Sequence, residues 1–180
     1  MKQIPLAKSG KFALVDDADF QFLIQFKWRA EPSRKQIYAI RSNATGEAGI
    51  QNHRSMHRLI LNPELGQQVD HIDHNGLNNQ RANLRLCSKR DNLRSRTLNK
   101  NNSSGYKGVS LDQHARTGRP TNKPWRVYLG YDTAGSRIYI GYFATAKEAA
   151  EAYDHATIEF YGEFAATNKS LNLLTLEPKS

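Results

Sequence analysis

The chain opens with short apolar runs separated by basic and polar segments. Residues 11–15 (KFALV) predict a strand, and Asp17 can cap a short helix whose apolar positions recur at helical spacing. Residues 37–40 predict a second strand, and residues 43–49 are rich in turn formers. We therefore expect a β-rich leader module over residues 1–52, in which no residue points to chemistry.

A second block has a different order of elements. Residues 56–61 predict a short helix or strand that ends before a proline. Residues 68–72 then predict a strand, Asn75-Gly76 a tight turn, and residues 83–86 another extended segment. Ser88 can cap a helix that runs to Arg94. The order is strand, strand, helix.

A third block follows a polar stretch that is typical of a linker. Residues 106–111, 124–131 and 137–143 predict three strands. Thr145 and Glu148 form a capping box at the start of an amphipathic helix over residues 146–161. This order predicts a three-stranded antiparallel sheet covered on one face by a helix.

The predicted fold class is α+β. Its expected divisions are a leader module, a central module, a linker, a sheet-and-helix domain and a tail, at residues 1–52, 53–98, 99–105, 106–168 and 169–180.

The charge suggests a partner of opposite sign. Lys and Arg number 26 against 17 acidic residues, which gives a net charge of +9. A basic protein often binds a polyanion, although charge alone fits solvated lysines equally well. Cys87 is the single cysteine, so neither an intrachain disulfide nor a Cys-rich zinc finger is expected. Met1 to Gly10 lacks the apolar core of a signal peptide and no run is long enough to cross a membrane, so we expect a cytoplasmic protein.

Four residues of the second block combine into a set suited to phosphodiester hydrolysis. The strand carries Asp70-His71, and the hairpin and helix that follow carry Asn83 and Asn92. Hydrolysis needs a general base for water, and a neutral imidazole serves near pH 7. A carboxylate and an amide oxygen are hard ligands that suit Mg²⁺ or Mn²⁺.

This block resembles the HNH (ββα-metal) endonucleases of phages and mobile elements, in the HNN variant that ends on asparagine. The resemblance implies that His71 is the general base and that Asp70 and Asn92 bind Mg²⁺ or Mn²⁺. It implies that Asn83 holds the hairpin and orients the histidine, and that the products carry a 5′-phosphate and a 3′-hydroxyl. Residues of the adjoining strand and helix are expected to grip phosphates: Arg85, Lys89, Arg90 and Arg94.

The third block resembles the Apetala-type (ethylene-response-factor) DNA-binding domain. The matching segments are Tyr106-Lys107-Gly108-Val109, Trp125-Arg126-Val127, Ile140-Gly141-Tyr142-Phe143 and Ala152-Tyr153-Asp154. The resemblance implies that the sheet enters the major groove, with Lys107, Trp125, Arg126, Tyr128 and Arg137 as candidate contacts. Because side chains alternate along a strand, Trp125 and Arg126 cannot share one face, and Arg126 is the preferred contact.

The sequence thus predicts a metal-dependent endonuclease of double-stranded DNA, a homing enzyme or nickase of phage or mobile-element origin. Neither a membrane nor an obligate protein partner is expected. The alternative is a sequence-specific DNA-binding regulator with an inactive nuclease module; an RNA-binding protein is disfavoured because no aromatic RNA-recognition motif is present. A monomer with one site would nick, whereas a dimer would cut both strands.

Overall fold

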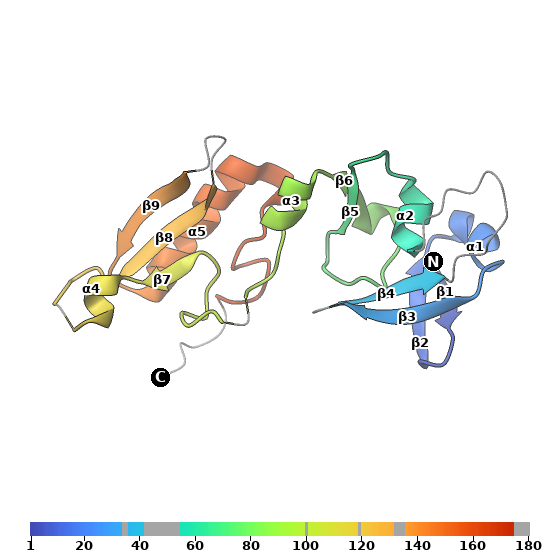
Figure 1. Ribbon diagram of the computed structural model, residues 1–180, viewed down its shortest axis with the longest axis horizontal. Helices are drawn as coiled ribbons and strands as arrows, with labels where there is room; N and C mark the ends of the chain where they lie inside the picture. Colours follow the sequence, from blue (N-terminus) through green and yellow to red (C-terminus); the bar gives the residue numbers. More distant parts are fainter. Residues whose placement is uncertain (34–35, 42–54, 100, 119, 132–135, 175–180) are drawn as a thin grey trace. The chain divides into compact units, whose positions relative to one another are not determined.

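The computed structural model describes residues 1–33, 36–41, 55–99, 101–118, 120–131 and 136–174, coloured in Figure 1. The chain forms two compact units, residues 1–92 and 93–180. Both combine helices with antiparallel strands, so the predicted α+β class is confirmed.

The first unit contains three two-stranded antiparallel sheets, pairing β1 with β2, β3 with β4, and β5 with β6. Its elements are β1 (Lys2–Leu6), β2 (Lys11–Val15), α1 (Asp17–Leu23), β3 (Trp28–Ser33), β4 (Gln36–Arg41), α2 (Met56–Leu61), β5 (Gln68–His71), the 3₁₀ turn η1 (Arg81–Asn83), β6 (Leu84–Cys87) and α3 (Lys89–Arg94). The predicted order strand, strand, helix is present as β5, β6 and α3.

One hydrophobic core joins the first two predicted blocks. Leu23 and Trp28 of the first block and Met56 and Leu84 of the second are all buried in the same cluster. A two-stranded ribbon cannot bury a core by itself, so each ribbon needs the others. Residues 1–92 form one compact unit, and the division expected at residue 52 stays a prediction.

Two strands of this unit were not predicted. Strand β1 contains Pro5 and strand β3 contains Pro32, and proline weakens a strand pattern. The turn expected over residues 43–49 lies outside the described residues.

The connection between β5 and β6 is fastened to the start of the chain. The N–H of Leu14 in β2 donates to the Leu77 carbonyl, and the N–H of Asn79 donates to the Leu14 carbonyl, both at 2.8 Å. Arg81 donates from Nε and Nη2 to the two carboxylate oxygens of Asp19 in α1, each at 2.8 Å. Contacts with β2 and α1 therefore determine the conformation of the polar connection between β5 and β6.

The second unit is a three-stranded antiparallel sheet, ordered β7-β8-β9, with the helix α5 along one face (Figure 1). Its elements are β7 (Val109–Leu111), α4 (Gln113–Arg116), β8 (Trp125–Tyr131), β9 (Arg137–Phe143), α5 (Ala146–Tyr161) and the 3₁₀ turn η2 (Gly162–Phe164). The capping box of Thr145 and Glu148 is confirmed. Two details differ from expectation: β7 is shorter, and the loop after it contains α4.

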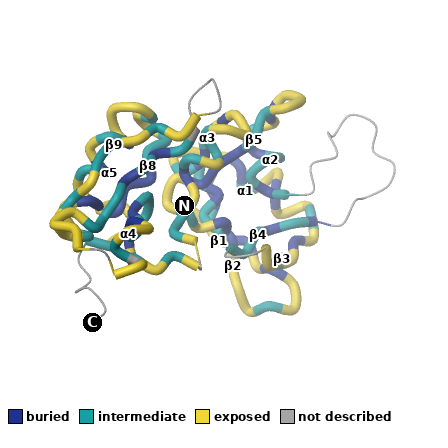
Figure 2. Tube along the Cα trace, turned by 60° about the vertical axis from the view of Figure 1, so that its left-hand side comes forward, coloured by how far each residue is buried: buried dark blue, intermediate teal, exposed yellow. Residues whose placement is uncertain are grey.

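The core of this unit lies between β8 and α5. Val127 and Leu129 are buried from the sheet side, and Ala149 and Tyr153 from the helix side. In Figure 2 the trace of β8 is buried or intermediate, whereas much of α4 and its loop is exposed. Gly108 has φ +76°, and a Cβ there would lie 2.0 Å from the Tyr153 ring, so only glycine lets this ring pack.

A buried asparagine ties the beginning of this unit to its end. Asn168 is fully buried, and its Oδ1 accepts from the Lys107 N–H at 2.6 Å. Its Nδ2 donates to Asp154 Oδ1 at 2.9 Å, and its own N–H donates to the same oxygen at 2.6 Å. The segment that follows α5 is thereby held against the segment that precedes β7.

Within the part of the chain that the structure describes, no helix is both long enough and apolar enough to cross a membrane.

Gly76 supports the first prediction. A Cβ at this position would lie 2.5 Å from the Ile37 carbonyl oxygen and 2.7 Å from the Tyr38 ring, so Gly76→Ala must push the turn away from β4. We expect thermal or denaturant unfolding of the first unit to show a loss of about 1–3 kcal/mol. Gly141→Ala is the control, because a Cβ there meets only the Phe143 ring at an ordinary 3.4 Å. Equal stability of the two variants would contradict this packing.

Candidate active site

Strand β5 presents two of the predicted residues to opposite sides. Side chains alternate along a strand, so Gln68 and Asp70 share one face and Val69 and His71 share the other. Val69 belongs to the hydrophobic core of the first unit. Asp70 and His71 are both buried, at 7% and 3% exposed. The sequence Asp-His therefore supplies one acidic and one imidazole group on the two sides of a single strand.

Asp70 is held by an arginine of the neighbouring strand. Arg85 stands opposite Asp70 in the β5–β6 register, and its Nη2 and Nε donate to Asp70 Oδ2 at 2.7 and 3.1 Å. Arg85 was predicted to contact phosphate. In the structure its guanidinium instead pairs with the candidate metal ligand Asp70, so the proposed DNA contacts leave Arg85 out.

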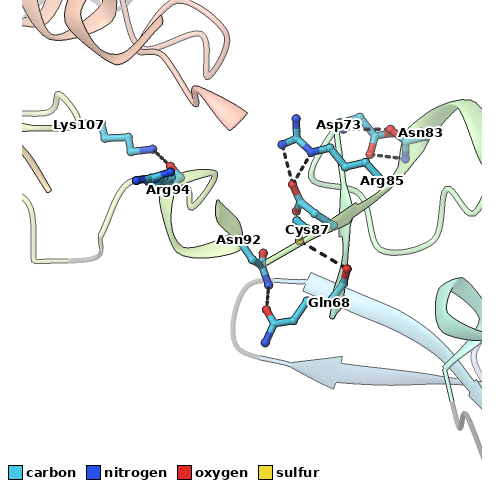
Figure 3. A network of polar contacts seen from close by, with 9 residues as sticks. Gln68, Asp73, Asn83, Arg85, Cys87, Asn92, Arg94 and Lys107 are labelled. Carbon is cyan, nitrogen blue, oxygen red and sulfur yellow. Dashed lines mark hydrogen bonds and ion pairs between the residues drawn. The ribbon is translucent and has the colours of Figure 1, made fainter. Parts of the chain in front are cut away.

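Asn92 reaches the Asp70 side of β5. Its Nδ2 donates to Gln68 Oε1 at 2.6 Å, as Figure 3 shows, and Gln68 shares a strand face with Asp70. A carboxylate oxygen and an amide oxygen from this face form a hard donor set that fits Mg²⁺ or Mn²⁺. No group of three or more His, Cys, Asp and Glu suited to a metal occurs among the described residues. The candidate set has a single carboxylate, so it would be completed by water and a phosphate oxygen.

His71 lies among aromatic rings. The ring centroid of His57 from α2 is 4.9 Å from that of His71, and the centroid of Tyr38 from β4 is 5.8 Å away. Burial lowers the pKa of His71 below its ordinary value, although Asn79, Asp73 and Asp70 oppose part of this shift. The imidazole is therefore neutral near pH 7, as a general base must be.

Asn83 closes the hairpin between β5 and β6. Its Nδ2 donates to Asp73 Oδ1 and to the Asn78 carbonyl, each at 2.8 Å, and its Oδ1 accepts from the Asp73 N–H at 3.0 Å (Figure 3). Burial acts to raise the pKa of Asp73, but hydrogen bonds from Asn75, Asn78 and Asn83 outweigh it and lower that pKa. Asp73 is thus a hairpin acceptor.

The contact with the histidine comes from a residue that the sequence analysis missed. His71 Nε2 lies 3.4 Å from Oδ1 of Asn79, whereas no hydrogen bond between Asn83 and His71 is present among the described residues. His57, Tyr38 and Gln68 were also missed as neighbours of the site. No local pattern marks Tyr38, His57 and Asn79, because the first two come from other elements and Asn79 comes from an irregular loop. Gln68 lies on β5 itself, two positions before Asp70.

The other candidate phosphate contacts have different surroundings. Lys89 and Arg90 are exposed on α3. The guanidinium of Arg94 lies over the Tyr161 ring at 4.4 Å. Lys107 donates from Nζ to the Arg94 carbonyl at 2.8 Å, and burial lowers the pKa of Lys107 to about 8 (Figure 3). This lysine is largely withdrawn from water, so we do not carry it forward as a DNA contact.

The sheet of the second unit has an apolar face and a polar face. Trp125 packs against the core beneath α5, so it lies on the opposite side of β8 from Arg126. Its contact with DNA stays a prediction, and Arg126 remains the preferred contact. The polar face carries the residues Ser110, Arg126, Tyr128, Arg137, Tyr139 and Tyr142.

Arg126 is positioned by its neighbours on that polar face. Its Nε donates to Ser110 Oγ at 3.1 Å, and its Nη1 lies 3.9 Å from Oδ2 of Asp112. Arg126 and Arg137 both lie over the Tyr128 ring, with centroid distances of 5.8 and 5.3 Å. Tyr128, Arg126 and Arg137 therefore remain together as candidate DNA contacts.

Comparison with known proteins agrees with the ββα arrangement. The family model described as HNH endonuclease matches residues 55–94, which include β5, β6 and α3. A protein of Acanthamoeba polyphaga mimivirus, named an uncharacterized HNH endonuclease, is 33% identical over 162 residues, 89% of this chain and 76% of the viral protein. The chain belongs to the HNH endonuclease family. In this HNH protein the family match covers Asp70, His71, Asn83 and Asn92.

A separate group of relatives matches the HNH protein over a shorter stretch. An AP2-like ethylene-responsive transcription factor of Arabidopsis thaliana is 40% identical over 72 residues, 40% of this chain and 13% of the plant protein. An ethylene-responsive transcription factor of Medicago truncatula is 32% identical over 92 residues, 51% of this chain and 31% of that protein. The three-stranded sheet with its helix is the AP2-like region. No solved structure matches the chain.

Two of the carboxylate–arginine pairs in the first unit give a stability prediction. The Asp70 and Arg85 side chains are 9% and 14% exposed, whereas Arg81, paired with Asp19, is 53% exposed. Removing one partner of a buried pair leaves an uncompensated charge, so Arg85→Met should lower the free energy of unfolding by about 3 kcal/mol or more. Arg81→Met removes a pair that water screens and should cost about 1 kcal/mol. Denaturant titration checks the order, and a larger loss for Arg81→Met would contradict it.

Proposed function

We propose that this HNH protein is a divalent-metal-dependent endonuclease that hydrolyses phosphodiester bonds in double-stranded DNA, as a homing enzyme or nickase of a mobile element. The observation that carries the proposal is the arrangement around β5. A buried, neutral His71 lies on one side of the strand, and Asp70 with Asn92 lies on the other side.

Asp70 and Asn92 would hold Mg²⁺ or Mn²⁺ through a carboxylate oxygen and an amide oxygen. When bound, the ion neutralises charge on the phosphate and on the leaving oxygen. The chain supports this assignment by bringing the two residues to one face of β5. Asn92 Nδ2 donates to Gln68 Oε1, and Gln68 shares a strand face with Asp70.

His71 acts as the general base. It accepts a proton from the attacking water, whose oxygen forms a new bond to phosphorus while the bond from phosphorus to the 3′ oxygen breaks. The leaving 3′ oxygen takes up a proton from solvent water, so the products carry a 5′-phosphate and a 3′-hydroxyl. The buried setting keeps the imidazole unprotonated before the reaction, and Asn83 keeps the hairpin closed around it.

The AP2-like unit binds the DNA duplex through its polar sheet face. Arg126 is pre-organised by Ser110 and Asp112 and stands beside Tyr128 and Arg137. A guanidinium held in one orientation is suited to paired hydrogen bonds with a base edge or a phosphate. The plant relatives are named as transcription factors, which supports the same role for this unit.

One observation favours the alternative, a DNA-binding regulator with an inert nuclease module. The carboxylate of Asp70 is already neutralised by Arg85. Incubation with plasmid DNA in Mg²⁺ or Mn²⁺ separates the two, because only the nuclease converts supercoiled DNA.

The nuclease predicts a sharp loss on removal of the base. His71→Ala should cleave plasmid on the order of 10²–10⁴-fold more slowly than the parent while its DNA affinity is unchanged. EDTA should abolish cleavage, and Asp70→Ala or Asn92→Ala should abolish it at any workable Mg²⁺ concentration.

His155→Ala is the matched control for the loss of a histidine, because His155 is exposed on α5. It should cleave at the parental rate. Near-normal cutting by His71→Ala, or full activity in EDTA, would defeat the proposed mechanism.

The sheet face predicts a second result. If Arg126 reads a base edge, Arg126→Ala should cost about 1–3 kcal/mol and relax preference at one position of the site. If it contacts phosphate, affinity should fall evenly across sequences and the slope of log affinity against log salt should shrink by about one. Salt-titrated binding to a randomised duplex library distinguishes these cases.

Lys147→Ala removes an exposed cation from α5, on the opposite side of the sheet, and controls for net charge. It should leave site preference unchanged. Parental affinity and preference in Arg126→Ala would place the DNA on another face.

A further inference from the structure

Asn79 is a buried amide beside the candidate base. Its side chain is fully buried, at 0% exposed. Its Nδ2 lies 3.5 Å from the Gly76 carbonyl oxygen, and its Oδ1 lies 3.4 Å from His71 Nε2. A buried amide that left either end unbonded would be costly, so both contacts count toward its satisfaction.

The Gly76 carbonyl decides which way this amide points. A carbonyl oxygen can only accept, so it requires the Asn79 nitrogen as its neighbour. With the nitrogen turned to Gly76, the oxygen must face His71. A rotated amide would set two acceptors against each other at Gly76.

The orientation of the Asn79 amide also determines the tautomer of His71. Asn79 Oδ1 is an acceptor, so the facing atom of a neutral imidazole must be a donor. The proton therefore lies on His71 Nε2, and the lone pair lies on Nδ1.

We propose that Asn79 is the positioning residue of His71, which it holds in the Nε2–H tautomer so that Nδ1 is the atom that accepts a proton from water. The role of His71 as a base rests on the proposed function; the tautomer rests on the contacts alone.

Strands β2 and β4 keep Asn79 in place. Its N–H donates to the Leu14 carbonyl in β2 at 2.8 Å. Gly76 packs so closely on β4 that a Cβ would meet the Ile37 carbonyl oxygen at 2.5 Å. The position of the Gly76 carbonyl, and hence the direction of the amide, follows from this packing.

The other contacts that the structure describes for His71 are of a different kind. His57 and Tyr38 contact it through their rings, and Asp70, Asp73 and His74 act on it through charge. A ring contact does not specify which nitrogen carries the proton. The contact with Asn79 Oδ1 does specify it, because that oxygen can only accept.

The tautomer can be read directly in the intact chain without DNA or metal. Long-range ¹H–¹⁵N correlation spectra of protein with ¹⁵N-labelled histidine distinguish a protonated from an unprotonated ring nitrogen. The His71 signals are those absent from His71→Ala. At neutral pH we expect a protonated Nε2 and an unprotonated Nδ1; the reverse tautomer, or a mixture, overturns the proposal.

Three variants link the tautomer to the reaction. Asn79→Leu removes the acceptor and should give mixed tautomers and a kcat lower by about 10- to 100-fold, with little change in KM. Asn79→Asp keeps an oxygen toward His71 while losing the donor to Gly76, so it should retain the tautomer and lose less of kcat. Gln80→Ala is the control, because Gln80 lies in the same loop but bonds to Asp16. It should keep both tautomer and kcat.

The outcomes separate this inference from the proposed function. Parental tautomer and kcat in Asn79→Leu overturn the role of Asn79. Should Asn79→Leu fail to fold, the parent and Asn79→Asp spectra decide: a lost tautomer in Asn79→Asp overturns the proposal and a retained one supports it. If the parent has the expected tautomer but cuts no DNA in Mg²⁺ or Mn²⁺, the nuclease proposal fails and the assignment of Asn79 stands.

Discussion

Two backbone hydrogen bonds at Leu14 determine the shape of the connection between β5 and β6. The Leu14 N–H donates to the Leu77 carbonyl, and the Leu14 carbonyl accepts from the Asn79 N–H. This connection is short, polar and poor in apolar anchors, so it has no core of its own. Strand β2 supplies a template for it, and the close packing of Gly76 on β4 fixes its tip. Asn83 then ties the two sides of the hairpin together. The geometry around His71 therefore depends on strands β2 and β4, which come well before it in the chain. A leader that carries no chemistry of its own nevertheless forms part of the site.

The candidate residues could be predicted where the signal was local. Asp70, His71, Asn83 and Asn92 lie on a strand, a hairpin and a helix whose order follows from sequence pattern, and the structure has those elements. Contacts that join distant segments could not be predicted in this way. Arg81 and Asp19 are 62 residues apart, and nothing in either neighbourhood specifies the other. The same holds for the His57 ring beside His71. Propensity and periodicity describe one element at a time, whereas these pairs result from how elements pack.

In the AP2-like sheet, the alternation of side chains along a strand predicts the facing residues of β8 correctly but not those of β9. It correctly separates Trp125, which packs beneath α5, from Arg126 on the polar face. It fails in β9, where a register shift opposite Val127 and Tyr128 inserts an extra residue. Tyr139 and Tyr142 are three positions apart and should face opposite sides of a regular strand. Instead their rings lie 5.7 Å apart on one face, with 51% and 40% of each residue exposed. An irregularity of this kind enlarges the aromatic surface beside Arg126.

The Asn168 contacts have a consequence for how such proteins arise. Asn168 follows α5, and its side chain bonds to the backbone of Lys107, which precedes β7, so the two ends of the sheet-and-helix unit lie next to each other. A domain whose ends meet can be joined into another chain without stretching or opening its core. The local match with plant transcription factors, which takes in 13% of one such protein, fits a piece that travels as a unit. The residue that seals the domain internally is thus also what makes it portable between proteins.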